Sequence, residues 1–232
     1  MTLIAFLRCI DGCVLISDRQ ASEWSGHSQE EKKTFVSEEK DFAIAGAGSG
    51  FDVVSIFSVL THDVTVVGSN VVARLRQAIQ DYCERSGPYS NPDVRVEALL
   101  IARQTEGLVP YEVRIHGSQF YINLISTIYR CCGIDAARII AGYFLKKKKL
   151  DELPWEEATQ YAIATMKEVG KEVNGVGRLE EFGFDITVML ENGAVYESEN
   201  YRQDSADLQH SFRILSNFSS EFTRTHSPTE ES

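Results

Sequence analysis

Two apolar runs near the start of the chain are separated by a tight-turn signal. Residues 3–9 and 13–18 are both compatible with strands, and the Asp-Gly pair between them is typical of a β-hairpin. Because the runs are nearly continuous rather than alternating, we predict that both faces of their sheet are covered. A second pair of strands is predicted at 34–36 and 42–45.

Helical periodicity follows the strand pairs. Apolar residues at steps of three and four predict helices over 53–60, 70–85, 134–146 and 154–172, and β-compatible runs predict further strands at 97–103, 111–125, 184–190 and 194–198. The order is strands, two helices, strands, two helices, strands. It predicts an α+β fold of the four-layer αββα sandwich type, because an alternating βαβ fold would need a helix between each pair of strands.

Composition narrows the class of protein. The chain has 232 residues and a net charge of −11, so a basic nucleic-acid-binding surface is not expected. We predict one domain over 2–198 and a polar, acidic, mobile tail over 199–232. No apolar run has the length of a membrane span and no signal peptide is recognisable, so no membrane partner and a cytoplasmic location are expected. Five cysteines, an odd number, indicate free thiols rather than disulfides, and no metal or cofactor is predicted.

Candidate chemistry begins at Thr2. A Met before a small residue is commonly removed, which would leave Thr2 with a free α-amine. The hydroxyl group is a nucleophile, and an α-amine with a pKa of about 7.7–8.0 can take its proton near neutral pH. Many chains begin in this way, so Thr2 alone carries little weight.

Three other positions add to the argument. Hairpin pairing brings Asp18 back beside Thr2, and Lys33 begins the third strand, where it lies alongside. A lysine here lowers the pKa of the terminal amine, and a carboxylate keeps the lysine charged and oriented. Gly46 lies where a strand gives way to a helix, so its N–H is a candidate oxyanion donor.

The sequence resembles the proteasome β-subunit and HslV family of N-terminal nucleophile hydrolases over about residues 2–195. Besides Thr2 and the Asp-Gly hairpin, the matching segments are Ser17-Asp18-Arg19, Lys32-Lys33-Thr34-Phe35 and Ile44-Ala45-Gly46-Ala47-Gly48, and more weakly Cys131-Cys132-Gly133 and the strand from Asp185 to Val188. The resemblance implies that Thr2 is the nucleophile, that Asp18 and Lys33 tune it, and that Gly46 stabilises the oxyanion. It also implies the αββα fold, a peptide or protein substrate, and a homo-oligomeric ring or an ATPase as partner.

The sequence also departs from that family. The distance from Thr2 to Lys33 is one residue short. Cys132 stands where the family has a serine near the nucleophile's amine, and a thiol is a weaker hydrogen-bond partner. The family's later aspartate is missing in the segment from Lys171 to Gly175, where Glu172 and Asn174 are the polar replacements. A single residue before Thr2 is typical of HslV-like chains and of connectase-like archaeal homologues.

Several functions therefore stay open. The first is a threonine peptidase that forms an acyl-enzyme, and the second is a connectase-like transpeptidase or protein ligase that uses the same intermediate. The third is a non-catalytic structural subunit, although the N-terminal helix of proteasome α-type chains is absent. The glycines at 46, 48 and 50 lack the spacing of a nucleotide-binding loop. Cys132 is a poor candidate for the nucleophile, because no histidine in the sequence has the context of a catalytic triad.

Overall fold

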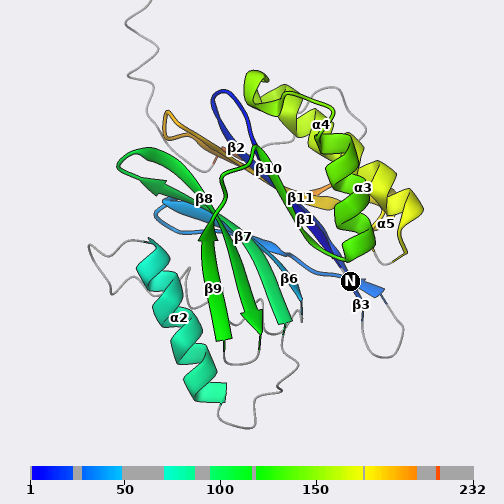
Figure 1. Ribbon diagram of the computed structural model, residues 1–232. Coiled ribbons are helices and arrows are strands. Elements are labelled where there is room, and N and C mark those ends of the chain that lie inside the picture. The colour runs from blue at the N-terminus through cyan, green and yellow to red at the C-terminus, as the bar shows by residue number, and fades with distance from the viewer. Residues whose placement is uncertain are drawn as a thin grey trace, which may run out of the picture.

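The structure is a computed structural model of the 232-residue chain (Figure 1). It describes residues 2–22, 28–48, 71–86, 95–116, 119–174, 176–202 and 213–214. Within these ranges the chain forms three antiparallel sheets.

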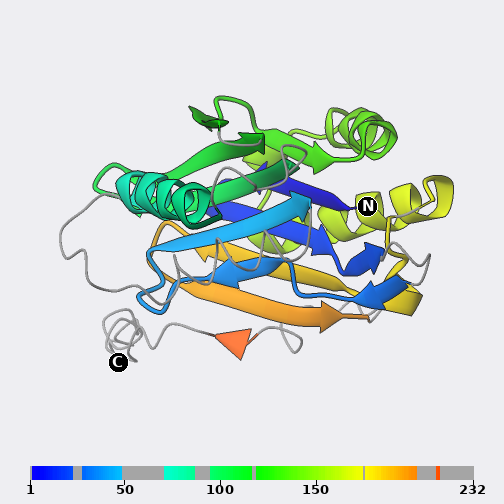
Figure 2. The same cartoon turned by 90° about the horizontal axis from the view of Figure 1, so that it is seen from below.

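The largest sheet has six strands in the order β10-β1-β2-β11-β12-β13. Their bounds are β1 Leu3–Arg8, β2 Gly12–Asp18, β10 Tyr129–Gly133, β11 Phe184–Leu190, β12 Val195–Tyr201 and β13 Arg213–Ile214. Figure 2 shows β12 in orange and β13 in red-orange at one edge of this sheet. Strands from the first and last quarters of the chain are thereby paired side by side.

The β1–β2 hairpin is confirmed. The N–H of Cys9 donates to the carbonyl of Gly12 at 2.9 Å, and the strands pair from Ile4↔Ser17 to Arg8↔Cys13. Every residue of β2 is buried, as are five of the six in β1, which confirms that both sheet faces are covered. Gly12 is needed here because an added Cβ would collide with the carbonyl of Met189.

The second large sheet has five strands in the order β5-β6-β7-β8-β9, and a small hairpin pairs β3 with β4. The bounds are β3 Gln20–Ser22, β4 Ser28–Glu30, β5 Thr34–Val36, β6 Phe42–Gly48, β7 Arg95–Gln104, β8 Gly107–His116 and β9 Gln119–Leu124. Consecutive strands of the five-stranded sheet follow one another along the chain. It is a meander with β9 at one edge.

The described helices are α2 Val71–Ser86, α3 Asp135–Leu145, α4 Trp155–Glu172 and the short α5 Leu179–Phe182, with a 3₁₀ turn at Leu150–Glu152. Figure 1 shows α3 and α4 together on one side of the molecule and α2 by itself on the other. Three of the four predicted helices are thus confirmed, while the one at 53–60 lies outside the described residues. No described helix is both long and apolar enough to cross a membrane.

Three apolar clusters hold these elements together. One joins the six-stranded sheet to α3 and α4 and includes Leu3 and Ile16. A second lies between the two large sheets and includes Ile4, Phe6 and Cys132. The third joins the five-stranded sheet to α2. Because neighbours on a strand point to opposite faces, Leu3 and Ile4 belong to different clusters.

The prediction of a four-layer αββα sandwich, with paired helices outside two sheets, is wrong for the described residues. Strands predominate, a third sheet is present, and α2 is the only helix described on the five-stranded sheet. Neither the β3–β4 hairpin, from residues 20–22 and 28–30, nor β10, from residues 129–133, was among the predicted strands. Both arise from strand pairing, which hydrophobic periodicity does not report.

The domain boundary at 198 stays a prediction. Strand β12 continues to Tyr201, and Tyr196 and Glu197 pair with Ile214 and Arg213 of β13.

Candidate active site

Thr2 immediately precedes β1, an interior strand of the six-stranded sheet. It is 6% exposed, and its carbonyl accepts a hydrogen bond from the N–H of Ile134 at 3.2 Å. Its hydroxyl oxygen Oγ1 accepts a hydrogen bond from the ammonium Nζ of Lys33 at 2.7 Å. The structure therefore fixes both the backbone and the side chain of Thr2.

Lys33 is held between three acceptors. Besides Thr2, its Nζ donates to Oδ1 of Asp18 at 2.6 Å and to the carbonyl of Gln20. An ammonium has three N–H donors, so each donor has one partner. The side chains of Lys33 and Asp18 are 6% and 0% exposed, so this ion pair is shielded from water.

Asp18 is bound at its other oxygen as well. Oδ2 accepts the N–H of Leu3 at 3.0 Å and that of Gly177 at 3.3 Å. Burial raises the pKa of Asp18, while the charge and hydrogen bond of Lys33 and the two backbone donors act in the opposite direction. The carboxylate is thus held in the site by groups that favour its charged form.

A second buried ion pair supports the backbone of Lys33. Nη1 of Arg19 lies 2.5 Å from Oδ1 of Asp185. Asp185 also accepts the N–H of Lys33 through Oδ2 at 3.2 Å and the N–H of Asn200 through Oδ1 at 3.2 Å. Next to it, the hydroxyls of Ser17 and Thr34 are hydrogen bonded at 2.9 Å. Asp185 therefore links β11, β12 and the start of β5.

Gly46 does not lie at the end of its strand. It belongs to β6, and its N–H donates to the carbonyl of Lys33 at 3.0 Å. This is the N–H that the sequence predicted as an oxyanion donor, and within the described structure it is engaged in the sheet. Its backbone is nonetheless hydrogen bonded to the backbone of Lys33, so Gly46 adjoins the site.

Cys132 is buried in the cluster between the two large sheets. It pairs with Ile4 across the β1–β10 ladder, is 0% exposed, and its Sγ lies 3.7 Å from Oε1 of Glu112. Burial, and then the charges of Glu112 and Glu97, raise the pKa of this thiol. No hydrogen bond joins Cys132 to Thr2 among the described residues.

The residue after Cys132 has a closer relation to Thr2. Gly133 pairs with Leu3, has φ +112°, and an added Cβ would collide with the carbonyl of Thr2. Its N–H donates to Oε2 of Glu97 at 3.0 Å. A side chain at this position would both strain the backbone and displace Thr2.

The predicted replacements for the missing family aspartate lie elsewhere. Glu172 and Asn174 are exposed at the end of α4, and Gly177, a little further along, provides the contact with Asp18. Sequence reasoning missed Gly177, Gln20 and the Arg19–Asp185 pair as parts of the site. Gly177 had a weak signal, as a glycine in the loop after a helix, whereas the carbonyl of Gln20 had none.

The arrangement is suited to activating the hydroxyl group of Thr2. A buried ammonium donates to the Thr2 hydroxyl oxygen, so it favours negative charge there. Among the described residues, no group of three or more His, Cys, Asp and Glu side chains is arranged to hold a metal ion.

Three solved structures with a fold similar to that of this chain are all Anbu proteins. Anbu (ancestral beta-subunit) from Yersinia bercovieri matches with a TM-score of 0.65 at 15% identity, over 93% of this chain and 88% of that one. An Anbu mutant from Hyphomicrobium sp. strain MC1 matches with a TM-score of 0.63 at 13% identity, over 96% of this chain and 90% of that one. The helical assembly of the Anbu complex from Pseudomonas aeruginosa matches with 0.63 at 16%, over 90% of each chain.

These comparisons correct the family suggested by sequence. No protein-family model and no curated protein matches the chain. The assignment to the proteasome β-subunit and HslV family, or to connectase-like homologues, is wrong, because the structural neighbours are Anbu proteins. The sheet-rich Anbu structures are the neighbours found, and at 13–16% identity they establish the fold alone. The chain has the fold seen in these Anbu structures.

Proposed function

We propose that the chain is a threonine-nucleophile peptidase in which Thr2 attacks a peptide bond. The observation that carries this proposal is the buried Thr2–Lys33–Asp18 arrangement, with Nζ of Lys33 2.7 Å from the Thr2 hydroxyl and 2.6 Å from Asp18. The proteasome-like fold of the Anbu neighbours supports it. The nucleophile becomes competent once the bond before Thr2 is cut and its α-amine is free.

In the first step, the Thr2 hydroxyl oxygen bonds to the carbonyl carbon of the substrate peptide. Its proton passes to the Thr2 α-amine, and the Lys33 ammonium stabilises the developing charge on Oγ1. The tetrahedral intermediate collapses with cleavage of the C–N bond, and the leaving amine takes the proton from the α-amine. Thr2 is left as an ester, the acyl-enzyme.

In the second step, water attacks the ester carbonyl and gives its proton to the α-amine. The C–O bond to Thr2 then breaks, the proton returns to Oγ1, and the acid product leaves. The Lys33–Asp18 pair does not change its protonation state during this cycle. Gly46 contributes as an oxyanion donor if its N–H exchanges the carbonyl of Lys33 for the substrate.

The solved Anbu complex with helical assembly supports a further part of the proposal, that this chain self-associates. Light scattering after size-exclusion chromatography tests it. A mass equal to one chain over a wide range of concentration would contradict self-association.

The test of the activity compares the wild type with the variants Thr2→Ala and Thr2→Ser, all three with residue 2 as the N-terminus. With Thr2 exposed, as verified by intact mass, the wild type is expected to cleave peptides from a mixed library and to form a trapped acyl-enzyme at Thr2. Thr2→Ala should lose more than about 10³-fold in rate, because it has no nucleophile. Thr2→Ser, which keeps the hydroxyl, should retain activity.

Cleavage by Thr2→Ala, or cleavage by protein that retains Met1, would contradict the assignment of Thr2. An added amine-bearing peptide provides a further measurement. If it is joined to the acyl fragment faster than water hydrolyses the ester, the second step is transfer rather than hydrolysis.

A further inference from the structure

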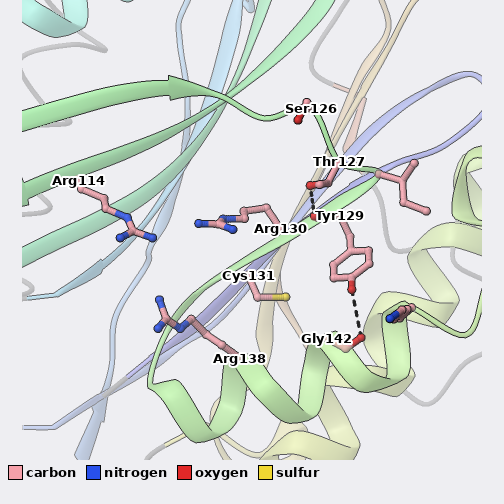
Figure 3. A pocket seen from close by; sticks show the side chains of 10 residues that line it. Arg114, Ser126, Thr127, Tyr129, Arg130, Cys131, Arg138 and Gly142 are labelled. Carbon is pink, nitrogen blue, oxygen red and sulfur yellow. Dashed lines mark hydrogen bonds between the residues drawn. The ribbon is translucent and has the colours of Figure 1, made fainter.

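A concave site whose lining does not include Thr2 lies between β8, β10 and α3. It has a volume of about 760 Å³, within the range of small-molecule sites. Figure 3 shows its lining, to which the segment between β9 and β10 also contributes. The basic side chains in the lining are Arg114, Arg130, Arg138 and Lys146, and the lining includes no carboxylate.

The three guanidinium groups come from different elements and approach one another. Arg114 belongs to β8, Arg130 to β10 and Arg138 to α3, and Figure 3 shows their ends directed toward a common space. Their side chains are 43%, 40% and 31% exposed, so they remain accessible from the pocket. Like charges brought together in this way favour an anion between them.

The carboxylates nearby do not balance these cations. Glu112 alone serves two of them, accepting from Nη2 of Arg130 at 2.7 and 2.8 Å and from Arg114 at 2.7 and 3.0 Å. Although burial opposes ionisation, these hydrogen bonds lower the pKa of Glu112 and keep it charged. Arg138 is paired with Asp135 and Glu97. Among the described residues, Lys146 has no carboxylate partner.

We propose that this pocket binds a small anion that carries two or more linked phosphate groups. Guanidinium forks match phosphate oxygens in a bidentate manner, and a lysine adds a point charge at the rim. The three guanidinium groups are directed toward one space, which fits a compact, densely charged group. The carboxylates of an extended acidic peptide are spaced by about 3.3–3.6 Å per residue along the chain, so they fit less well.

The remaining lining fits a ligand larger than a single phosphate ion. Tyr129 and Ile128 provide apolar surface beside the cations, and the Tyr129 hydroxyl is anchored to the carbonyl of Gly142 at 3.4 Å. The pocket therefore accommodates either a bare chain of phosphates or one attached to an organic group. Both sources share the chemistry that the arginines recognise.

The experiment measures binding of tripolyphosphate, ATP, inorganic phosphate and a glutamate-rich peptide to the full-length protein by calorimetry at 150 mM salt. We expect tripolyphosphate or ATP to bind at least about tenfold more tightly than inorganic phosphate, and more weakly as salt is raised. Equal affinity for tripolyphosphate and ATP would mean that the phosphate chain is sufficient, whereas tighter ATP binding would add a contact with the organic group. Either result supports the proposal.

Two variants and a matched control locate the site. Arg138→Gln and Lys146→Gln should each weaken tripolyphosphate binding at least about tenfold. Lys149→Gln changes a lysine three residues further along that does not line the pocket and pairs with Glu152, so it should bind as the wild type does. Urea unfolding of each variant verifies that it is folded.

Three results would overturn the proposal. The first is the absence of tripolyphosphate and ATP binding, and the second is an equal loss of affinity in Lys149→Gln. The third is tighter binding of the glutamate-rich peptide than of tripolyphosphate, which would make the pocket a peptide-docking surface.

Discussion

Replacing Lys33 by Met tests the electrostatics of the candidate site directly. The substitution keeps an unbranched side chain and removes the ammonium from beside Asp18, whose side chain is 0% exposed. Removing one partner of a buried ion pair typically costs about 3–5 kcal/mol, because the other charge is left without compensation. The Thr2 hydroxyl and the Gln20 carbonyl lose a donor as well. We therefore expect the free energy of unfolding at pH 7 to fall by about 3–5 kcal/mol.

The loss should depend on pH with a definite sign. Burial raises the pKa of Asp18 and Lys33 opposes that rise, so removing Lys33 raises the pKa further. A carboxyl group with a folded-state pKa above its unfolded value of about 3.9 contributes stability that is present below pH 3.9. That stability is lost as the pH rises through the folded-state pKa. The deficit of Lys33→Met should therefore be smallest near pH 4 and should grow toward pH 7.

Urea unfolding at both pH values, followed by circular dichroism, measures this deficit. Lys32→Met is the matched control, because Lys32 is the adjacent residue and its pairs with Glu197 and Glu199, at 3.2 and 3.1 Å, are partly exposed. It should cost less than about 1 kcal/mol. A Lys33→Met deficit below about 1 kcal/mol at pH 7, or one that does not change with pH, would refute the account of a shielded ion pair.

Three further outcomes are expected. Asp185→Asn leaves the buried Arg19 without its closest counter-charge, so the free energy of unfolding should fall by about 3–5 kcal/mol in urea titrations; a change under about 1 kcal/mol would contradict the importance of this pair. Gly133→Ala adds a side chain at φ +112°, so backbone strain alone should cost about 1–3 kcal/mol, whereas Gly142→Ala, where the nearest atom to an added Cβ is 3.9 Å away, should cost less. Burial raises the pKa of the Cys13 and Cys131 thiols to about 12, so peptide mapping after iodoacetamide treatment at pH 8 should find both unmodified in folded protein and modified in urea; rapid labelling of the folded state would disprove their burial.

The parts of the site that were predictable are those linked by local strand geometry. Thr2 and Asp18 lie at the open end of one hairpin, whose register follows from the Asp-Gly turn and the apolar runs on either side. Lys33 immediately precedes β5, and its position beside Thr2 and Asp18 was predicted. The approach of Asp18 to Thr2 is visible in the sequence because the turn that connects β1 and β2 is short.

The unpredicted parts depend on long-range pairing or on single backbone groups. The register of β10 against β1 determines on which side of the sheet Cys132 lies, and β10 itself was not predicted. The N–H of Gly46 bonds to a carbonyl because β5 and β6 pair up to that position. Gly177 contributes only its N–H to Asp18, so no side-chain chemistry marked it in advance.

The pairing of Arg19 with Asp185 has a consequence for the order of events during synthesis. The two residues are 166 positions apart, and ribosomes add about 5–20 residues per second. Asp185 therefore leaves the ribosome about 10–30 s after Arg19, and β11 cannot join β2 earlier. During that interval β2 has β1 as a neighbour but lacks β11, so the site around Thr2 is incomplete and more open than in the folded chain. Access of a processing enzyme to the peptide bond before Thr2 is thus greatest while the chain is still being made.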